Sequence, residues 1–169
     1  MPTTITEPKQ SVCVQSNCVE KPGTAHSTSM KAGLLCKPST GTYENGYDVC
    51  DAQYGDLNAG EGNVYQEEIK ARHAQSTTPY DKTTAHVAGD QIKVIRHEVN
   101  KVYWLKGSAS SLTMSVDAKI ITAANGLVAV QTEHTSTPKP HHFWTCVKAV
   151  SGATWVQGRY MGISSMNTA

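Results

Sequence analysis

Hydrophobic and polar positions alternate most clearly in the middle of the chain, between Val87 and Val130. Gly89–Asp90 predicts a turn at the start of this stretch, since glycine and aspartate favour turns. Ile92 and Val94 then flank the polar Lys93, an alternation typical of a half-buried strand. The stretch therefore predicts the centre of a β-structure.

The same stretch continues with another strand and a hairpin. Val102 and Trp104 repeat the alternation. Farther on, the apolar runs Ile120–Ile121 and Leu127–Val130 flank Asn125–Gly126. An Asn-Gly pair between apolar runs is the strongest short-range signal for a β-hairpin. We expect a compact β-unit of roughly three or four strands here.

Apolar runs before this stretch are shorter. Leu34–Cys36 predicts a strand that Pro38 ends, and Asn45–Gly46 is a second hairpin signal. Tyr47 and Val49 are two residues apart, so on a strand both side chains lie on one face.

One segment fits two interpretations. Val64–Gln75 (VYQEEIKARHAQ) is the best helical candidate, because Glu68 and Arg72 are four residues apart and its other residues suit a helix. Its apolar stripe is weak, however, and an alternating strand fits equally well. Both interpretations stay open at this point.

The C-terminal part predicts two further strands. His141–Val150 (HHFWTCVKAV) contains no charge before Lys148, which indicates burial on both faces. Alternate side chains of this strand face the core, and this core-facing series starts either at Phe143 or at Trp144. Ala153–Ile163 predicts the last strand, in which two glycines indicate a bulge or bend: Gly158 and Gly162.

Composition limits the size of the core. The chain has 169 residues, of which 38% are hydrophobic, and its one phenylalanine is Phe143. We expect a mainly β protein, a small β-barrel or β-sandwich with at most one short helix. Met1–Ala25 is rich in polar residues and proline, which predicts an extended N-terminal arm. We expect residues 26–169 to form a single β domain, with residues 85–163 as its best-supported barrel core.

Charge and hydropathy exclude several classes of protein. Fifteen basic and 14 acidic residues give a net charge of +1 without any basic block. This balance argues against nucleic-acid binding, which depends on neutralising phosphates. No apolar stretch is long enough to span a bilayer. The first residues, MPTTITEPKQ, lack the apolar core of a secretory signal, so we expect synthesis in a cytoplasm.

The cysteines give a choice between thiols and one bridge. There are five, Cys13, Cys18, Cys36, Cys50 and Cys146. An odd count without a secretory signal favours buried thiols. The main alternative is one bridge in the N-terminal half, such as Cys13–Cys18 or Cys36–Cys50, formed only in an oxidising medium.

Neither a metal site nor a catalytic site is predicted. His141, His142 and Cys146 lie close in sequence, but their spacing does not match zinc ligands, and adjacent strand residues point to opposite faces. Cys146 with His97 or His134 could form a thiol–imidazole pair, yet a cysteine in an apolar strand usually packs. No nucleophile elbow, zinc-protease or phosphate-loop motif occurs. We therefore predict no catalytic residue, no metal and no cofactor.

Large side chains are the candidates for contact with a partner. Core packing is the default for a tryptophan, but in a chain poor in aromatics it is also the strongest candidate for an interface. The segment from His142 to Trp144 follows a proline-rich loop and is the most conspicuous of these. The predicted interface residues are Val12, Val14, Trp104, His142, Phe143, Trp144 and Trp155.

The order of these features over residues 85–163 resembles a known family. A Gly-Asp turn leads into a strand (Gly89–Val94), and Val-Tyr-Trp-Leu (Val102–Leu105) follows. Next come Ala-Ala-Asn-Gly-Leu-Val (Ala123–Val128), the apolar strand with Val147, and the closing Ala-Thr-Trp-Val (Ala153–Val156). The chain resembles the capsid decoration proteins of tailed bacteriophages, also called head-stabilising or cement proteins.

The resemblance implies a small β-barrel without catalysis, bound as a homotrimer to the major capsid protein on the outside of an icosahedral head. Such a protein is made in the host cytoplasm and resides on the virion, and Met1–Ala25 would be its arm. The cysteines and the long region Cys13–Gly62 depart from the family's pattern. An alternative function is a receptor- or carbohydrate-binding β module, with an exposed Trp144 or Tyr103 as its platform. A thiol or zinc hydrolase that uses Cys146 is a third.

Overall fold

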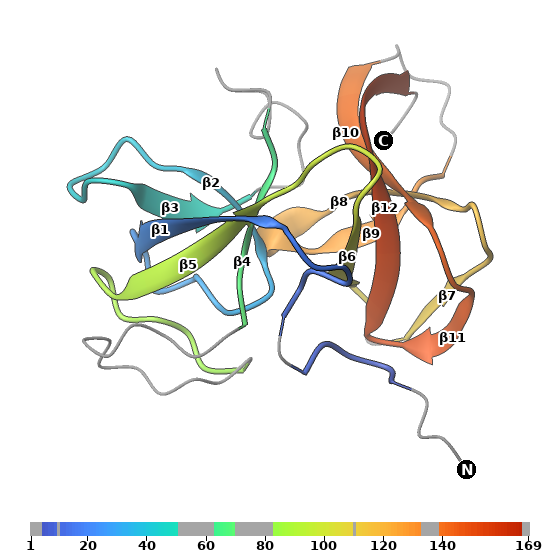
Figure 1. Ribbon diagram of the computed structural model, residues 1–169, viewed down its shortest axis with the longest axis horizontal. Coiled ribbons are helices and arrows are strands. Elements are labelled where there is room, and N and C mark those ends of the chain that lie inside the picture. The colour runs from blue at the N-terminus through green and yellow to red at the C-terminus, as the bar shows by residue number, and fades with distance from the viewer. Residues whose placement is uncertain are drawn as a thin grey trace.

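The computed structural model describes residues 5–9, 11–50, 63–69, 83–109, 111–132 and 139–166. The protein is mainly β, as predicted. Within the described ranges the one helical element is a 3-10 turn, η1 (Ala124–Gly126). Figure 1 shows two β lobes side by side, joined by the chain that runs from β5 to β6.

The first lobe is a closed barrel of five strands in the order β1-β3-β2-β4-β5, in which β5 pairs with β1. Only β1 and β3 run parallel, and the other neighbours are antiparallel. The bounds are β1 (Val19–Ala25), β2 (Leu35–Pro38), β3 (Gly46–Val49), β4 (Tyr65–Glu67) and β5 (Gln91–Arg96).

The second lobe is an antiparallel sheet of five strands in the order β6-β12-β10-β8-β9, accompanied by the pair β11-β7. The bounds in the sheet are β6 (Val102–Lys106), β8 (Lys119–Thr122), β9 (Val128–Val130), β10 (Lys139–Cys146) and β12 (Trp155–Met166). The pair consists of β7 (Leu112–Met114) and β11 (Val150–Ala153).

The strands of the central stretch form as predicted. In β5 the buried Ile92 and Val94 alternate with the exposed Lys93. The hairpin at Asn125–Gly126 joins β8 to β9. Asn125 and Gly126 both have positive φ, 59° and 72°, which explains why this turn needs an Asn-Gly pair.

The other hairpin signal is also confirmed. β2 and β3 pair antiparallel, and Asn45 in the loop between them has a φ of 54°. Tyr47 and Val49 pack in the same core cluster, as their spacing predicts. The bulge predicted for the last strand occurs as well, since Phe143 faces Gly162 whereas Trp144 faces Tyr160.

The segment with two interpretations is a strand where it is described. Tyr65–Glu67 forms β4, which pairs with β2 on one side and β5 on the other, and all three residues are buried. Pairing on both sides outweighs the helical preference of the glutamates. Residues 70–75 of this segment lie outside the described residues.

The closed barrel lies elsewhere than predicted. We expected it in residues 85–163, but it is formed by Val19–Arg96, and most of the predicted core forms the open sheet. Likewise, residues 19–25 belong to β1 and not to an extended arm. β1 (VEKPGTA) carries little apolar signal because it packs with small residues, and a Cβ on Gly23 would lie 2.8 Å from the Tyr47 ring.

Two apolar clusters fill the molecule. One lies inside the barrel and includes Met30, Tyr65 and Ile92. The larger cluster draws residues from both lobes, among them Leu35 and Ile95 of the barrel and Trp144 of the sheet. The two lobes therefore share the larger cluster.

Candidate functional site

The N-terminal segment is built into the edge of the second lobe. Before β1 begins, residues 11–15 lie along β6, on the side opposite β12. The Trp104 N–H donates to the Val12 carbonyl (2.7 Å), and the Val14 N–H donates to the Val102 carbonyl (3.1 Å). The segment thus covers the edge of β6, which would otherwise expose a row of unpaired backbone groups.

A buried carboxylate holds the start of this segment. Glu68 is 4% exposed, and its Oε1 accepts hydrogen bonds from the backbone N–H groups of Val12 and Ile69, both at 2.8 Å. Its Oε2 accepts a hydrogen bond from the Ser11 hydroxyl at 2.6 Å. The Val12 side chain is completely buried in the larger core cluster. Polar and apolar contacts therefore fix the same short stretch of chain.

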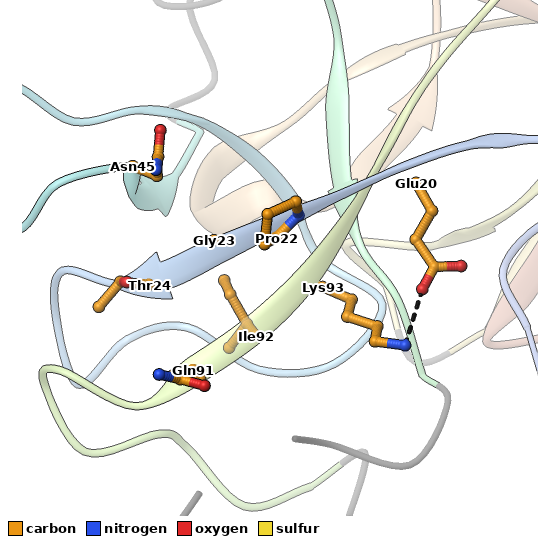
Figure 2. A pocket seen from close by; sticks show the side chains of 8 residues that line it. All are labelled: Glu20, Pro22, Gly23, Thr24, Asn45, Gln91, Ile92 and Lys93. Carbon is orange, nitrogen blue, oxygen red and sulfur yellow. Dashed lines mark ion pairs between the residues drawn. The ribbon is translucent and has the colours of Figure 1, made fainter. Parts of the chain in front are cut away.

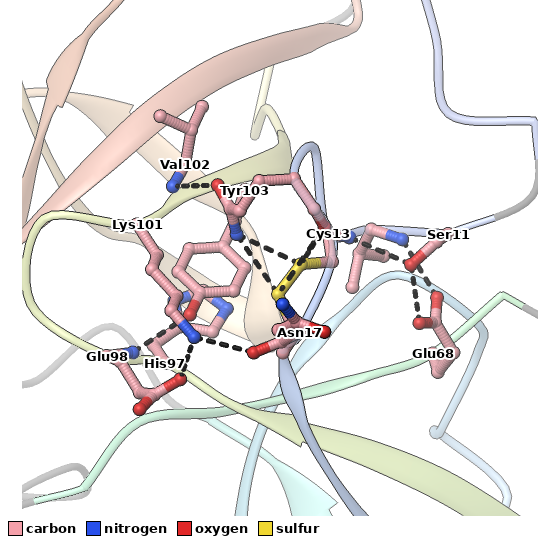
Figure 3. Close-up of a disulfide and its surroundings, with 12 residues drawn as sticks. Ser11, Cys13, Asn17, Glu68, His97, Glu98, Lys101, Val102 and Tyr103 are labelled. Carbon is pink, nitrogen blue, oxygen red and sulfur yellow. Dashed lines mark hydrogen bonds and ion pairs between the residues drawn. A yellow bond between two sulfur atoms is a disulfide. The ribbon is translucent and has the colours of Figure 1, made fainter.

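A disulfide between Cys13 and Cys18 closes the loop between this segment and β1 (Figure 3). The Gln15 side chain donates from Nε2 to both sulfur atoms, and its Oε1 accepts the Val102 N–H at 2.8 Å. Lys101 Nζ donates to the Asn17 carbonyl at 2.6 Å. The bridge is one of the two left open by the sequence, and for these two cysteines the expectation of thiols was wrong.

The other three cysteines are buried thiols, as expected. The alternative bridge between Cys36 and Cys50 does not occur, because the two lie in different core clusters on opposite faces of the β2–β3 ladder. Burial raises the pKa of the Cys36 thiol well above its usual value, and the nearby Cys50 adds to this. The Cys36 thiol is thus kept neutral.

The Cys146–His97 pair does not form. The Cys146 thiol donates to the Lys148 carbonyl at 3.2 Å, and burial raises its pKa. Trp144 Nε1–H donates to His97 Nδ1 at 3.0 Å, so the ring proton is on Nε2 and faces Gln66 Oε1 at 2.9 Å. Both nitrogens of this imidazole are occupied. His134, the other candidate base, lies outside the described residues.

His97 instead organises a buried network between the lobes. Its ring stacks on Tyr103 with centroids 3.7 Å apart and meets the ring of Tyr160 edge-on. Burial, together with the nearby His142, holds the pKa of His97 well below its usual value, so the ring is neutral. Gln66 continues the network, since its Nε2 donates to the carbonyls of Gly33 and Trp104.

The histidines and cysteine grouped in the sequence do not converge on a metal. The described part of the chain contains no group of three or more His, Cys, Asp or Glu side chains that could hold an ion. Cys13 and Cys18 are joined to each other, and His142 Nδ1 lies 2.7 Å from the Tyr160 hydroxyl.

Most of the predicted interface residues belong to the core. Trp144 is 0% exposed, so the expectation that it forms an exposed platform was wrong, and the same holds for Tyr103. In β10, the alternate side chains that start at Trp144 face the core. The other predicted residues that the structure buries are Val12, Trp104, His142 and Trp155. Of the set, Val14 is exposed and Phe143 is half-buried.

The sequence missed a second buried polar cluster. His86 Nε2 bonds to Glu67 Oε1, and His86 Nδ1 lies 3.6 Å from Asp90 Oδ2, with all three side chains buried. His86 and Asp90 are four residues apart around the predicted turn at Gly89. Glu67 comes from β4, so no local spacing could have linked it to them.

Two of the grooves on the described part of the surface are relevant to function. A groove of about 460 Å³ lies over β1 and β5, where Lys93 forms an ion pair with Glu20 at 3.0 Å and Gln91 and Asn45 line the wall (Figure 2). A second groove, of about 180 Å³, lies where residues 5–6 approach Trp104 and Trp155.

Three exposed apolar side chains lie in or next to the bulge of β12. A Cβ on Gly162 would lie 3.7 Å from Val99 Cγ2, and Met161 and Ile163 lie on either side of that glycine. Val99 is 56% exposed, Met161 38% and Ile163 47%. We refer to Val99, Met161 and Ile163 as the bulge patch. No local sequence pattern marks it, because it depends on the bulge and on the loop after β5.

The chain matches no protein-family model and no curated protein. No helix in the described part of the chain is long and apolar enough to cross a membrane.

Proposed function

We propose that this chain is a structural virion protein that binds and stabilises the outer surface of an assembled icosahedral capsid. Its partners are the major capsid protein and two further copies of itself, and its place is the virion exterior after synthesis in the host cytoplasm. The basis is the order of features from Gly89 to Val156, which resembles that of capsid decoration proteins. A mainly β architecture is compatible with this role.

The bulge patch supports the proposal most directly. Exposed apolar side chains close to one another on a strand and its neighbouring loop can mark a contact with another protein. The neighbouring end of β12, from Gly162 to Met166, contains no charged residue. β12 lies between β6 and β10, but its pairing with β6 ends at Arg159. Beyond that residue, charged side chains would be a common device that keeps other chains away from the strand. The bulge patch therefore replaces Trp144 as the candidate contact surface.

Heads assembled from the major capsid protein proposed as its partner provide the test. In co-sedimentation, we expect saturable binding that Val99→Asp weakens at least tenfold. Val116→Asp is the matched control, because Val116 is 52% exposed in a turn away from the bulge patch. Equal binding by the two variants would rule out the bulge patch, and no binding by the unmodified chain would rule out the function.

A second candidate is a carbohydrate-binding module that uses the groove of Figure 2. The observation in its favour is the polar lining, since Asn45 and Gln91 amides and the Glu20–Lys93 pair can hydrogen-bond to hydroxyl groups. A glycan array tests it. Binding that is lost in Gln91→Ala and kept in Val99→Asp would favour this function over capsid decoration.

A further inference from the structure

The disulfide spans the short linker, here called the hinge, between the N-terminal segment docked on β6 and the barrel. Residues 11–15 are docked on β6, β1 begins at Val19, and only residues 16–18 join the two. The Cα atoms of Cys13 and Cys18 are 6.4 Å apart. Five residue steps of an open chain can reach about 17 Å. The bond therefore restricts the docked segment to positions beside its own β1.

The site on β6 and Glu68 that receives the segment, here called the seat, requires an occupant. An empty seat would leave the Glu68 carboxylate without the Ser11 and Val12 donors and the Trp104 N–H without the Val12 carbonyl. It would also open the core position of Val12 to water. Buried polar groups without partners are costly, so the seat favours a filled state.

The same contacts can be made in two ways. A segment can fill the seat of its own chain, or it can fill the seat of a second copy with identical hydrogen bonds and identical burial. Exchange of identical elements through a hinge loop is a low-cost route to association. The contacts are the same in both cases, so the conformation of the hinge decides which of them forms.

We propose that the Cys13–Cys18 disulfide is a redox latch that decides whether the N-terminal segment fills its own seat or that of a second copy. With the bond closed, the hinge is held folded and the segment stays on its own β6. With the bond reduced, the hinge can extend and residues 11–15 can pair with β6 of another chain. The inference is independent of the proposed function.

The chemistry of the latch is thiol–disulfide exchange. On closing, the two thiols lose two protons and two electrons, and a small-molecule disulfide such as oxidised glutathione takes up both electrons and is released as two thiols. Cys13 and Cys18 are half-buried, within reach of such a molecule, whereas Cys36, Cys50 and Cys146 are buried. A reducing cytoplasm therefore favours exchange of the N-terminal segment between chains, and an oxidising medium favours the chain whose segment stays on its own β6.

Two further contacts set the behaviour of the reduced hinge. Asn17 has a φ of 67°, a conformation that suits a tight turn, and its carbonyl accepts from Lys101, which also pairs with Glu98 at 2.5 Å. These contacts favour the folded hinge even without the bond. In the reduced chain, exchange of the segment therefore competes with the folded hinge, and a higher protein concentration favours exchange.

Cross-linking within an isotopic mixture tests the proposal on the full chain. Chains with the photo-reactive p-benzoylphenylalanine in place of the exposed Val14 are prepared with natural nitrogen and with 15N, then mixed in equal amounts. The mixture is reduced with a phosphine, incubated at high concentration and irradiated, and a second sample is kept oxidised throughout. Mass spectrometry then counts links from position 14 to β6 that join a light to a heavy peptide.

We expect mixed links to be at least tenfold more frequent in the reduced sample than in the oxidised one, and to increase with concentration. The double variant Cys13→Ser/Cys18→Ser should behave like the reduced chain. If that variant folds poorly, the comparison of the phosphine-treated chain with the oxidised chain is sufficient. Adding Val12→Asp should abolish links to β6. Equal frequencies of mixed links in the oxidised and reduced samples, at any concentration, would overturn the proposal.

Discussion

At the scale of single residues, His97 links the chemistry of the chain to its stability. The folded chain holds this imidazole neutral, because it is buried and because Trp144 donates to its Nδ1. In the unfolded chain its pKa returns to about 6.5. The unfolded state therefore binds the proton more readily than the folded state, and acid favours unfolding.

We expect the free energy of unfolding to fall as the pH drops below about 6.5, with a slope that approaches about 1.4 kcal/mol per pH unit for this one group. Urea denaturation between about pH 6.5 and pH 5 measures it, above the range in which ordinary carboxylates titrate. His97→Gln cannot ionise, so its curve should be flatter by the same amount. Parallel curves for the two chains would contradict the assignment.

The sequence could not assign these side chains correctly. His97, Trp144 and Gln66 are far apart in the chain, and a tryptophan after a polar loop can pack in a core or contact a partner. The structure resolves this because β10 turns Trp144 toward the loop after β5, where His97 needs a donor. Such a hydrogen bond depends on pairing between elements and leaves no local pattern.

At the scale of elements, the N-terminal segment behaves as part of the sheet. Val12 is 0% exposed, so Val12→Ala should lower the free energy of unfolding by about 1.5–3 kcal/mol. Val14 lies two residues on and is 43% exposed, so Val14→Ala should change it by less than about 0.5 kcal/mol. Chemical denaturation of both variants measures the difference. A segment that is not docked in solution would give the same small change for both.

The turn η1 depends on Gly126 for two reasons. Its φ is +72°, and a Cβ there would lie 2.5 Å from the Leu35 carbonyl oxygen. Gly126→Ala should therefore cost about 2–4 kcal/mol in stability. Gly152 has a similar φ of +67° but no atom closer than 3.8 Å, so Gly152→Ala should cost only about 1–2 kcal/mol. Thermal or urea unfolding compares them, and equal losses would contradict the role of the Leu35 contact.

Strands and turns that leave a local pattern in the sequence were predicted, and those that leave no such pattern were missed. Asn45–Gly46 and Asn125–Gly126 marked hairpins because both turns need positive φ, and Ile92 and Val94 marked β5 because one face is buried. β1 was missed, since its two buried residues, Gly23 and Ala25, are small. The Cys13–Cys18 bridge was one of two open possibilities, because sequence spacing does not show which cysteines a strand brings together.

At the scale of the whole molecule, the closed barrel is assembled from segments distant in sequence. β1 pairs with β5, although about 70 residues separate them. The mainly β class follows from local alternation, but the closure of residues 19–96 into a barrel follows from long-range pairing. The candidate contact surface has the same origin, because the bulge patch joins the loop after β5 to the end of β12.

Electron cryo-microscopy of heads tests the central claim most directly. Heads assembled from the major capsid protein proposed as the partner are saturated with the full chain, and reconstructions with and without it are compared. We predict additional density on the outer surface, in groups of three copies, that fits both β lobes and places the bulge patch against the capsid or a neighbouring copy. Identical reconstructions, or density only inside the head, would contradict the proposed function.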